Sequence, residues 1–282
     1  MSQVMTRSRT TARTDASLPS IWRVGLSRGA LELKQFFRER DSLIFTFLLP
    51  VAFMLLFGLI FGDQQIGGGF AYTQILLPAM LTMGIVSTSL VNIGVWIAID
   101  RDNGTLRRLV STPMPRTAYF LGKVVMMVFI GLAETVLILA VGALVYDVQM
   151  PQTWQKWLTL GWVGLLSFAV LGVLGVAISS LPRTSRSAAA VIQFPTLVLQ
   201  FVSGIFIPFQ QLPDWLQDAS AFFPLKWIAQ GFRSAFLPDD MAAAEPAGAW
   251  EYDRILLVLL AWLVGGLVVC ATTFRWKKRG DG

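Results

Sequence analysis

Six long hydrophobic stretches, separated by shorter polar connections, dominate this chain of 282 residues. The hydrocarbon core of a bilayer is about 30 Å thick and needs about 20 residues of α-helix to cross it. Every stretch is long enough to do so. The pattern therefore predicts an all-α membrane protein with six transmembrane helices, at residues 42–62, 74–99, 117–146, 158–181, 188–207 and 255–274.

The basic residues are concentrated in alternate connections. Of the 23 Lys and Arg residues, 19 lie in segments 1–41, 100–123, 182–187 and 275–282, and four lie in 63–74, 147–157 and 208–254. Basic residues that flank membrane helices remain in the cytoplasm. We therefore predict a multi-pass protein of the bacterial inner (cytoplasmic) membrane with both termini in the cytoplasm.

The two ends of the chain differ from the predicted transmembrane domain, residues 42–274. Residues 1–18 are polar, and we expect a disordered cytoplasmic tail, while 275–282 form a basic cytoplasmic tail. In residues 19–41, apolar and basic side chains alternate at helical spacing, which predicts an amphipathic helix in the cytoplasmic interface. Its apolar members are Trp22, Leu26, Leu33, Phe36 and Phe37.

Composition excludes several classes of function. The chain is 55% hydrophobic and 14% charged, well below the roughly 25% charged residues of a soluble domain. The net charge of +6 comes from the predicted cytoplasmic segments, so we expect no nucleic-acid partner. The chain has no histidine and no G-x-x-x-x-G-K-[ST] sequence, and we expect no metal, no cofactor site and no enzyme activity in it.

Glu134 is the one carboxylate well inside a predicted span. A charge near the bilayer centre costs roughly 2–4 kcal/mol, so such residues face the bundle interior or a cavity. Two interpretations stay open: a residue of the substrate path, or a protonated side chain that bonds to a neighbouring helix.

Two helical faces carry polar stripes. Gln193, Thr196, Gln200 and Ser203 are spaced three, four and three residues apart, which places them on one face of the fifth span. Asn92 shares a face of the second span with Thr82 and Ser89. Such stripes line a substrate path or join helices through hydrogen bonds. We favour the path for the fifth span and helix contacts for the second, and we retain Asn92 as a candidate path residue.

The connection 100–116 predicts a short amphipathic helix that projects into the cytoplasm. Its apolar positions are Leu106, Leu109 and Val110, and its basic positions are Arg101, Arg107, Arg108 and Arg116. Such a helix can dock in a groove of another protein, although a charged turn that obeys the positive-inside rule would show the same residues.

The connection 208–253 is not uniformly polar. It contains short apolar pieces that are interrupted by prolines and are too short to cross a membrane. Irregular backbone at membrane depth must be buried in protein or face a water-filled space. We therefore predict two re-entrant helices on the external side.

Three pieces of the chain resemble the membrane subunits of type-2 ABC exporters, the group that includes daunorubicin-resistance permeases. They are R-E-R-D-S-L-I-F-T-F-L-L-P (38–50), G-T-L-R-R-L-V-S-T-P-M-P-R (104–116) and S-G-I-F-I-P-F-Q-Q-L-P-D-W-L-Q (203–217), the last followed by P-L-K-W-I-A-Q-G-F-R (224–233). The resemblance covers nearly the whole chain from about residue 20. The family often has an acidic E-R-G-T-L-E-R pattern in the second piece, which this chain replaces in part.

The resemblance implies roles for these segments. Residues 19–41 would be the connecting helix, and 100–116 the helix that couples to an ATPase, centred on Gly104, Thr105, Leu106, Arg107, Arg108 and Leu109. The re-entrant helices would form an external gate with Pro208, Leu212, Pro213, Trp215 and Pro224. Two copies of a separate ABC ATP-binding subunit would bind ATP and Mg²⁺, and a second copy of this chain or a homologous permease would complete the pathway within the membrane lipid.

We therefore expect the permease subunit of an ATP-driven exporter for an amphipathic drug-like or lipid-like compound. One alternative is a permease for polysaccharides or glycolipids, which often lines its path with aromatic residues. Another is a secondary transporter, which would show more ionisable groups within its spans and an internal repeat. A membrane anchor without transport activity is a third, against which the polar stripes argue.

Overall fold

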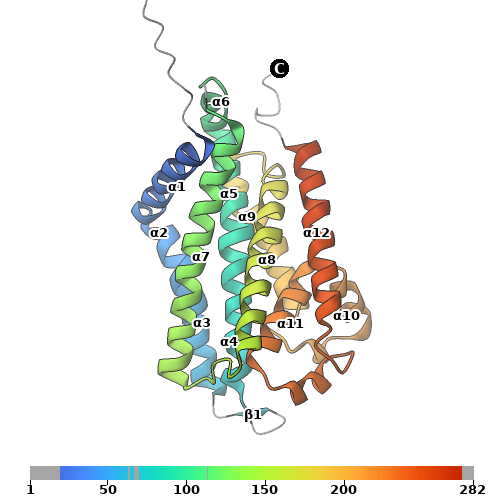
Figure 1. Ribbon diagram of the computed structural model, residues 1–282. Helices are drawn as coiled ribbons and strands as arrows, with labels where there is room; N and C mark the ends of the chain where they lie inside the picture. Colours follow the sequence, from blue (N-terminus) through green and yellow to red (C-terminus); the bar gives the residue numbers. More distant parts are fainter. Residues whose placement is uncertain (1–19, 63, 67–69, 113, 275–282) are drawn as a thin grey trace, which may run out of the picture.

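The computed structural model describes residues 20–62, 64–66, 70–112 and 114–274 of the chain. The described chain folds into a bundle of long helices (Figure 1). One end carries α6 (Thr105–Val110), and the other carries a hairpin of β1 (Gln65–Ile66) and β2 (Phe70–Ala71). We call them the α6 end and the hairpin end. The predicted tails 1–18 and 275–282 lie outside the described residues.

Within the described residues, five helices are long and apolar enough to cross a membrane. The first runs over Arg40–Phe61 as α2 (Arg40–Leu43), η1 (Ile44–Leu48) and α3 (Leu49–Phe61), and the second over Tyr72–Asp102 as α4 (Tyr72–Ile85), η2 (Val86–Asn92) and α5 (Ile93–Asp102). The other three are α7 (Arg116–Tyr146), α8 (Trp154–Ile178) and α12 (Tyr252–Thr273). They overlap five of the six predicted spans.

The remaining predicted span corresponds to α9, Ser185–Val202. It has 18 residues and includes Arg186, Gln193 and Gln200, so it is less apolar than the five longer helices. It packs beside α5 within the bundle (Figure 1). A six-span layout therefore remains a prediction.

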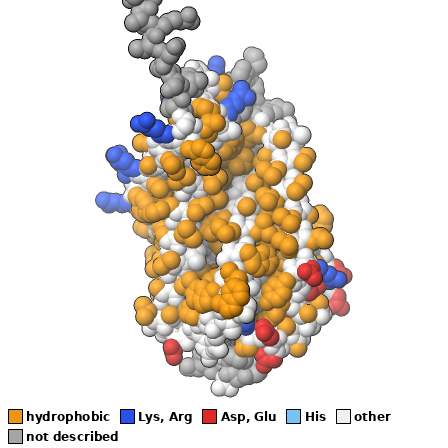
Figure 2. Space-filling view, viewed as in Figure 1, with side chains coloured by type: hydrophobic (Ala, Val, Ile, Leu, Met, Phe, Trp, Pro, Cys, Tyr) orange, Lys and Arg blue, Asp and Glu red, His pale blue; other side chains and the backbone are white. Residues whose placement is uncertain are grey.

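The second helix is the centre of the bundle. Most residues of Tyr72–Asp102 are buried, whereas most residues of the other four candidate spans are partly or fully exposed. The face built from α7, α8 and α12 is covered with hydrophobic side chains, and Lys and Arg side chains gather near α1 and α6 (Figure 2). Such a surface requires an apolar solvent, because a soluble monomer rarely exposes apolar patches of this extent.

One structural boundary differs from the predicted one in a way that matters for the site. The second helix continues to Asp102, so Asp100 and Arg101 belong to a helix rather than to a connection. Lys123 is counted with the cytoplasmic basic residues of 100–123 but also falls within the predicted span 117–146, and it lies buried two turns inside α7. Asp100 and Lys123 find partners within the protein, which offsets the cost of burying their charges.

Helix α1, Ile21–Arg38, occupies the segment predicted to be amphipathic, and the Ser20 side chain caps it by accepting a hydrogen bond from the Arg23 amide. Its apolar residues divide between two faces instead of forming one. Phe36 is buried against the bundle, whereas Trp22 and Leu26 are 69% and 54% exposed. The exposed face is the one available to a membrane interface.

The segment between α9 and α12 folds into four short elements. They are η3 (Phe209–Gln211), α10 (Asp214–Ala221), α11 (Pro224–Phe236) and η4 (Asp239–Ala244). All 13 residues of α11 are buried, and the helix packs on α4, α8 and α12. Pro224 begins α11 at a position where a proline suits a helix, because the first amide has no partner there.

Candidate coupling and permeation sites

Helix α6 combines one anchored side chain with two exposed basic ones. Gly104 precedes it with φ of +71°, a left-handed conformation that glycine adopts without strain. Leu106 is fully buried, and Leu109 is half-buried. Arg107 and Arg108 are exposed at the tip of the bundle. The buried leucine attaches the helix to the bundle while the arginines stay accessible to a partner. Val110, expected on the apolar face, is 42% exposed.

A buried ion cluster lies just inside α6 and joins three helices. The Lys123 Nζ atom of α7 is 2.7 Å from Glu32 Oε2 of α1 and 3.0 Å from Asp100 Oδ2 of α5. Tyr119 donates a hydrogen bond of 2.9 Å to the same Asp100 oxygen. Arg28 approaches Glu32 Oε1 at 2.6 Å. Because each charge has a partner of opposite sign, the cluster fixes the ends of α1, α5 and α7 relative to one another.

The next two residues of α5 bind the connection between α8 and α9. Arg101 donates to the Ser179 carbonyl at 2.6 Å and to the Ser179 hydroxyl at 3.2 Å. The backbone amide of Ser185 donates to Asp102 Oδ2 at 2.8 Å, at the start of α9. Movement of α6 and α5 would therefore reach α9 through these contacts.

Close packing of α1 on α7 depends on glycines. A Cβ atom built on Gly25 would lie 2.4 Å from Leu121, and one on Gly29 would lie 2.7 Å from Val125. These glycines flank Ser27 in a G-x-S-x-G sequence, a spacing typical of hydrolase nucleophiles at a strand-to-helix turn. Here the sequence lies within α1, and the Ser27 hydroxyl donates to the Val24 carbonyl at 2.9 Å. The spacing serves helix packing, and the chain has no histidine to activate the serine.

Glu134 is buried in the middle of α7, opposite the π-helical segment η2. The Thr88 hydroxyl of η2 donates a short hydrogen bond to Glu134 Oε2. Oε1 has no hydrogen-bond partner among the described residues, and a Cβ built on Gly84 would lie 2.8 Å from it. Glu134 thus bonds to the neighbouring helix, which is the second of its two predicted interpretations; a role in transport remains open.

Three of the four stripe residues on α9 point into the bundle. Thr196, Gln200 and Ser203 are buried, and Gln193 is exposed. Gln200 Oε1 and Ser203 Oγ have no partner among the described residues. Asn92 instead donates to the Thr46 hydroxyl of η1 at 3.2 Å, which joins the first two spans. The interpretation of Asn92 as a helix contact therefore fits the geometry better than a path lining.

A groove of about 840 Å³ lies between α7, α8 and α12 in the described chain. None of the candidate path residues lines it: Glu134, Gln193, Thr196, Gln200, Ser203 and Asn92. The groove is therefore separate from the predicted substrate path.

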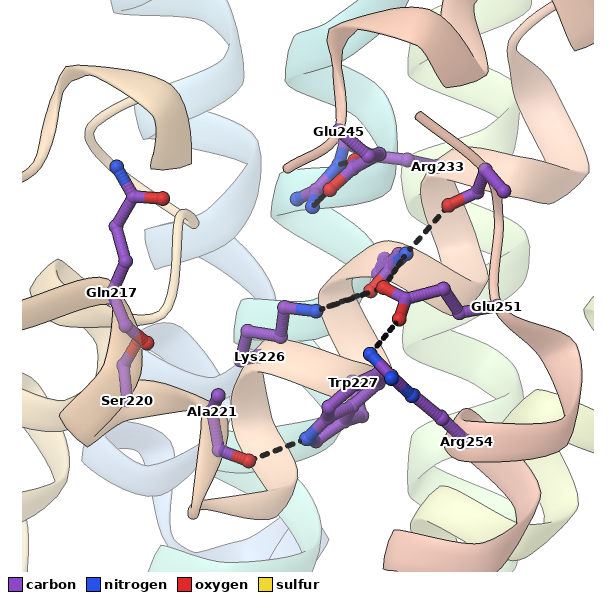
Figure 3. A network of polar contacts seen from close by, with 11 residues as sticks. Gln217, Ser220, Ala221, Lys226, Trp227, Arg233, Glu245, Glu251 and Arg254 are labelled. Carbon is purple, nitrogen blue, oxygen red and sulfur yellow. Dashed lines mark hydrogen bonds and ion pairs between the residues drawn. The ribbon is translucent and has the colours of Figure 1, made fainter. Parts of the chain in front are cut away.

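The segment predicted to be the gate is held by a polar network around α11 (Figure 3). Arg233 makes a bidentate contact with Glu245, at 2.7 and 3.2 Å. Lys226 donates to Gln230 at 2.6 Å and lies 3.8 Å from Glu251, which also pairs with Arg254 at 2.5 Å. These contacts connect α11 to the loop before α12.

The ammonium group of Lys226 lies in the interior of this network. Burial lowers the pKa of Lys226 to about 8, while the nearby carboxylates of Glu251 and Glu245 act in the opposite direction. Its ammonium group also lies 3.6 Å from the centroid of the Trp227 ring, a cation–π distance.

The predicted gate residues begin or cap these short elements. Pro208 precedes η3, Pro213 precedes α10, and Pro224 opens α11. Leu212 is buried, whereas Trp215 on α10 is 70% exposed. The prolines interrupt the helices as the sequence indicated, and the exposed tryptophan is suited to an interface between membrane and water.

A family model described as ABC-2 type transporter matches residues 29–237, which contain α6, α11 and the ion-cluster residues Glu32, Asp100 and Lys123. The chain belongs to the ABC-2 type transporter family. Its members are membrane transport subunits that work with an ATP-binding subunit. The matched region includes the three pieces of sequence that suggested a type-2 ABC exporter.

Two relatives of this ABC-2 family chain differ in how much of their length the match covers. It is 23% identical to the "Inner membrane transport permease YadH" of Escherichia coli (strain K12) over 252 residues, which cover 87% of this chain and 93% of the relative. It is 25% identical to the "Probable multidrug ABC transporter permease YbhR" of the same strain over 171 residues, which cover 60% of this chain and 45% of that protein.

Proposed function

We propose that this ABC-2 permease exports an amphipathic drug-like or lipid-like compound from the cytoplasm or inner leaflet, and that a separate subunit hydrolyses the ATP. The observation that carries the proposal is the geometry of α6. Leu106 anchors this helix in the bundle, while Arg107 and Arg108 are presented at its tip. The sequence has no phosphate-binding loop of its own, in agreement with this division of labour.

The proposed layout has six spans, with α9 as the fifth. The α6 end faces the cytoplasm of a bacterial inner membrane, and both termini lie on that side, as the positive-inside rule favours. The α10–α11 segment then lies on the external side as a gate. The relative named as an inner membrane permease supports this location.

ATP binding would act on the bundle through α6. The helix Tyr72–Asp102 is continuous from the α6 end to the hairpin end, so displacement of α6 moves the whole element. The ion cluster makes α1 and α7 follow it, and the contacts of Arg101 and Asp102 transmit the movement to α9. ATP can shift this equilibrium only through different affinities for the two states.

The exposed face of α9 supports a second membrane subunit in the pathway. Phe194, Val198 and Phe201 are 69%, 47% and 43% exposed, and they recur at helical spacing. Two copies of this chain, or this chain and a homologue, would place the buried polar residues of α9 close to the shared axis. The same aromatic face supports the second candidate, a permease for polysaccharides or glycolipids.

Reconstitution tests the proposal directly. Proteoliposomes with this permease and its ABC ATP-binding subunit should transport a fluorescent anthracycline in an ATP-dependent manner. Arg107→Glu combined with Arg108→Glu should reduce both transport and co-purification of the ATP-binding subunit at least tenfold. Arg183→Glu in the other connection on this side is the matched control and should change neither. Transport that persists without an ATP-binding subunit would disprove the proposal.

A further inference from the structure

The groove of about 840 Å³ between α7, α8 and α12 has no role in the proposed export path. Its volume falls within the range of about 300–1,000 Å³ that is usual for small-molecule sites. Helix α7 contributes residues from Arg116 to Val128, which at 1.5 Å per residue extend over about 18 Å. The groove therefore covers little more than one leaflet of a hydrocarbon core about 30 Å thick.

The basic residues of the groove in the described chain come from the first eight residues of α7. Arg116 and Thr117 open helix α7 at the α6 end, and Lys123 follows two turns later. The walls beyond them are apolar or small, and no acidic residue is among the lining residues of the described chain. The molecule that fits has an anionic head near the α6 end and an apolar tail directed toward the bilayer centre.

The start of α7 adds to the attraction for an anion. Arg116 is exposed and is the first residue of a helix of 31 residues, and its N-cap Pro115 supplies no side-chain cap. The N-terminus of a helix carries a partial positive charge and amide donors that favour anions. Phe274, which closes the groove on α12, lies 5.4 Å below the guanidinium of Arg101.

We propose that this groove is a binding site for an anionic phospholipid of the surrounding leaflet, with its phosphate at Arg116 and the start of α7 and one acyl chain between α7, α8 and α12. Basic pockets between transmembrane helices bind anionic headgroups in this way. Because the groove borders the helix that carries Lys123 and Tyr119, a bound lipid would support the packing of the ion cluster. The inference requires only that the helices are embedded in a membrane, not that the chain exports a drug.

Native mass spectrometry of the purified permease tests the site, with phosphatidylglycerol and phosphatidylcholine as probes. The wild type should retain one phosphatidylglycerol at concentrations where phosphatidylcholine is not retained. Arg116→Ala should reduce that retention at least fivefold by removing the head contact. Ala271→Trp should reduce it at least fivefold by filling the groove from an exposed position of α12.

Two variants control for general effects of substitution. Ala261→Trp introduces the same side chain at an exposed position of α12 that does not line the groove, and Arg183→Ala removes a basic residue from the neighbouring connection. Both should retain lipid within twofold of the wild type, and all variants should elute as monodisperse protein. Equal retention of both lipids, or unchanged retention in Ala271→Trp, would overturn the site.

The groove could instead hold a molecule that is being transported. Addition of ATP distinguishes a transported lipid from a resident one. In the complex with the ATP-binding subunit, a resident lipid stays bound during ATP hydrolysis. Release of phosphatidylglycerol on addition of ATP would identify it as a transported molecule and would contradict the proposal. If the complex retained phosphatidylglycerol but did not export the anthracycline, the result would count against the proposed function and not against the lipid site.

Discussion

At Lys123, a single ammonium group compensates two carboxylates that come from different helices. Its side chain is 2% exposed, and its partners Glu32 and Asp100 lie 91 and 23 positions away in the chain. Removing one member of a buried ionic cluster leaves uncompensated charge, which costs more than the cluster itself contributes. The residue is therefore more sensitive to substitution than its position near a predicted connection suggests.

Lys123→Met should lower the free energy of unfolding by about 3–5 kcal/mol, since Glu32 and Asp100 would then be buried without this cation. Thermal unfolding in detergent measures the change. Lys34→Met, at an exposed position of α1, is the control and should have little effect. Adding Glu32→Gln and Asp100→Asn to Lys123→Met should recover much of the loss. If Lys123→Met alone were as stable as the wild type, the cluster would not hold these helices together.

Lys226 gives the network around α11 a pH dependence. Burial lowers its pKa to about 8 from an ordinary value of 10.5; Glu251 and Glu245 oppose the shift, while Arg233 and Arg254 reinforce it. The unfolded chain then holds more protons than the folded chain between about pH 8 and 10.5, so stability rises with pH in that window. The difference in melting temperature, wild type minus Lys226→Met, should therefore be larger at about pH 9.5, inside that window, than at about pH 7.5, below it. A constant or falling difference would contradict the assignment.

At the scale of elements, the contact between α8 and η2 brings two helix backbones very close together. A Cβ built on Gly175 would lie 2.8 Å from the carbonyl oxygens of Ser89 and Leu90. Backbone oxygens cannot rotate away as a side chain can. The π-helical segment η2 also carries Thr88, the hydrogen-bond donor to Glu134. Single π-helical turns are frequent at functional sites, and here the turn is held between α7 and α8.

Gly175→Ala should separate α8 from η2 and lower the melting temperature by several degrees, as expected for overpacking that costs about 1–3 kcal/mol. Gly164→Ala on the same helix meets no atom within 4 Å and should be neutral or slightly stabilising. Tryptophan fluorescence during heating measures the melting temperatures of both variants. If the two variants melted alike, the contact at Gly175 would not determine the packing of α8.

The sequence predicted the long helices well and their junctions less well. Apolar length alone locates five of the spans, because a helix needs about 20 predominantly apolar residues to cross a hydrocarbon core. It could not reveal η2, since nothing in V-S-T-S-L-V-N distinguishes a π-helical turn from an α-helical one. The ion cluster joins residues far apart in the chain, so only the presence of Lys123 near an apolar run hinted at it. The four-residue spacing of Gly25 and Gly29 is a sign in the sequence of close helix packing.

At the scale of the whole molecule, the exposed apolar surface is shared between lipid and a proposed second membrane subunit. The exposed face of α9 carries Phe194 and Phe201, and the same helix carries the buried polar residues Thr196 and Gln200. In a symmetric dimer, the same residues from both copies meet near the axis.

Cysteine cross-linking tests this contact. In a Cys270→Ser background, Phe194→Cys should form a disulfide between two copies in membranes under mild oxidation. Leu144→Cys, at a native side chain that is 85% exposed on α7, should not. Cross-linking at Leu144→Cys alone would move the contact away from α9. A pairing of Phe194→Cys only with a homologous permease would identify a heterodimer.

The central claim is that α6 is a cytoplasmic docking helix for an ATPase encoded in a separate chain. Labelling with a membrane-impermeant maleimide in right-side-out vesicles tests it most directly, with single cysteines at Arg107→Cys on α6 and Trp215→Cys on α10 in the Cys270→Ser background. Both native side chains are exposed, so access to the reagent depends on the side of the membrane. The account predicts immediate labelling at Trp215→Cys and labelling at Arg107→Cys only after the vesicles are opened. Immediate labelling at Arg107→Cys with protection of Trp215→Cys would contradict it, because no cytoplasmic ATPase could then reach α6.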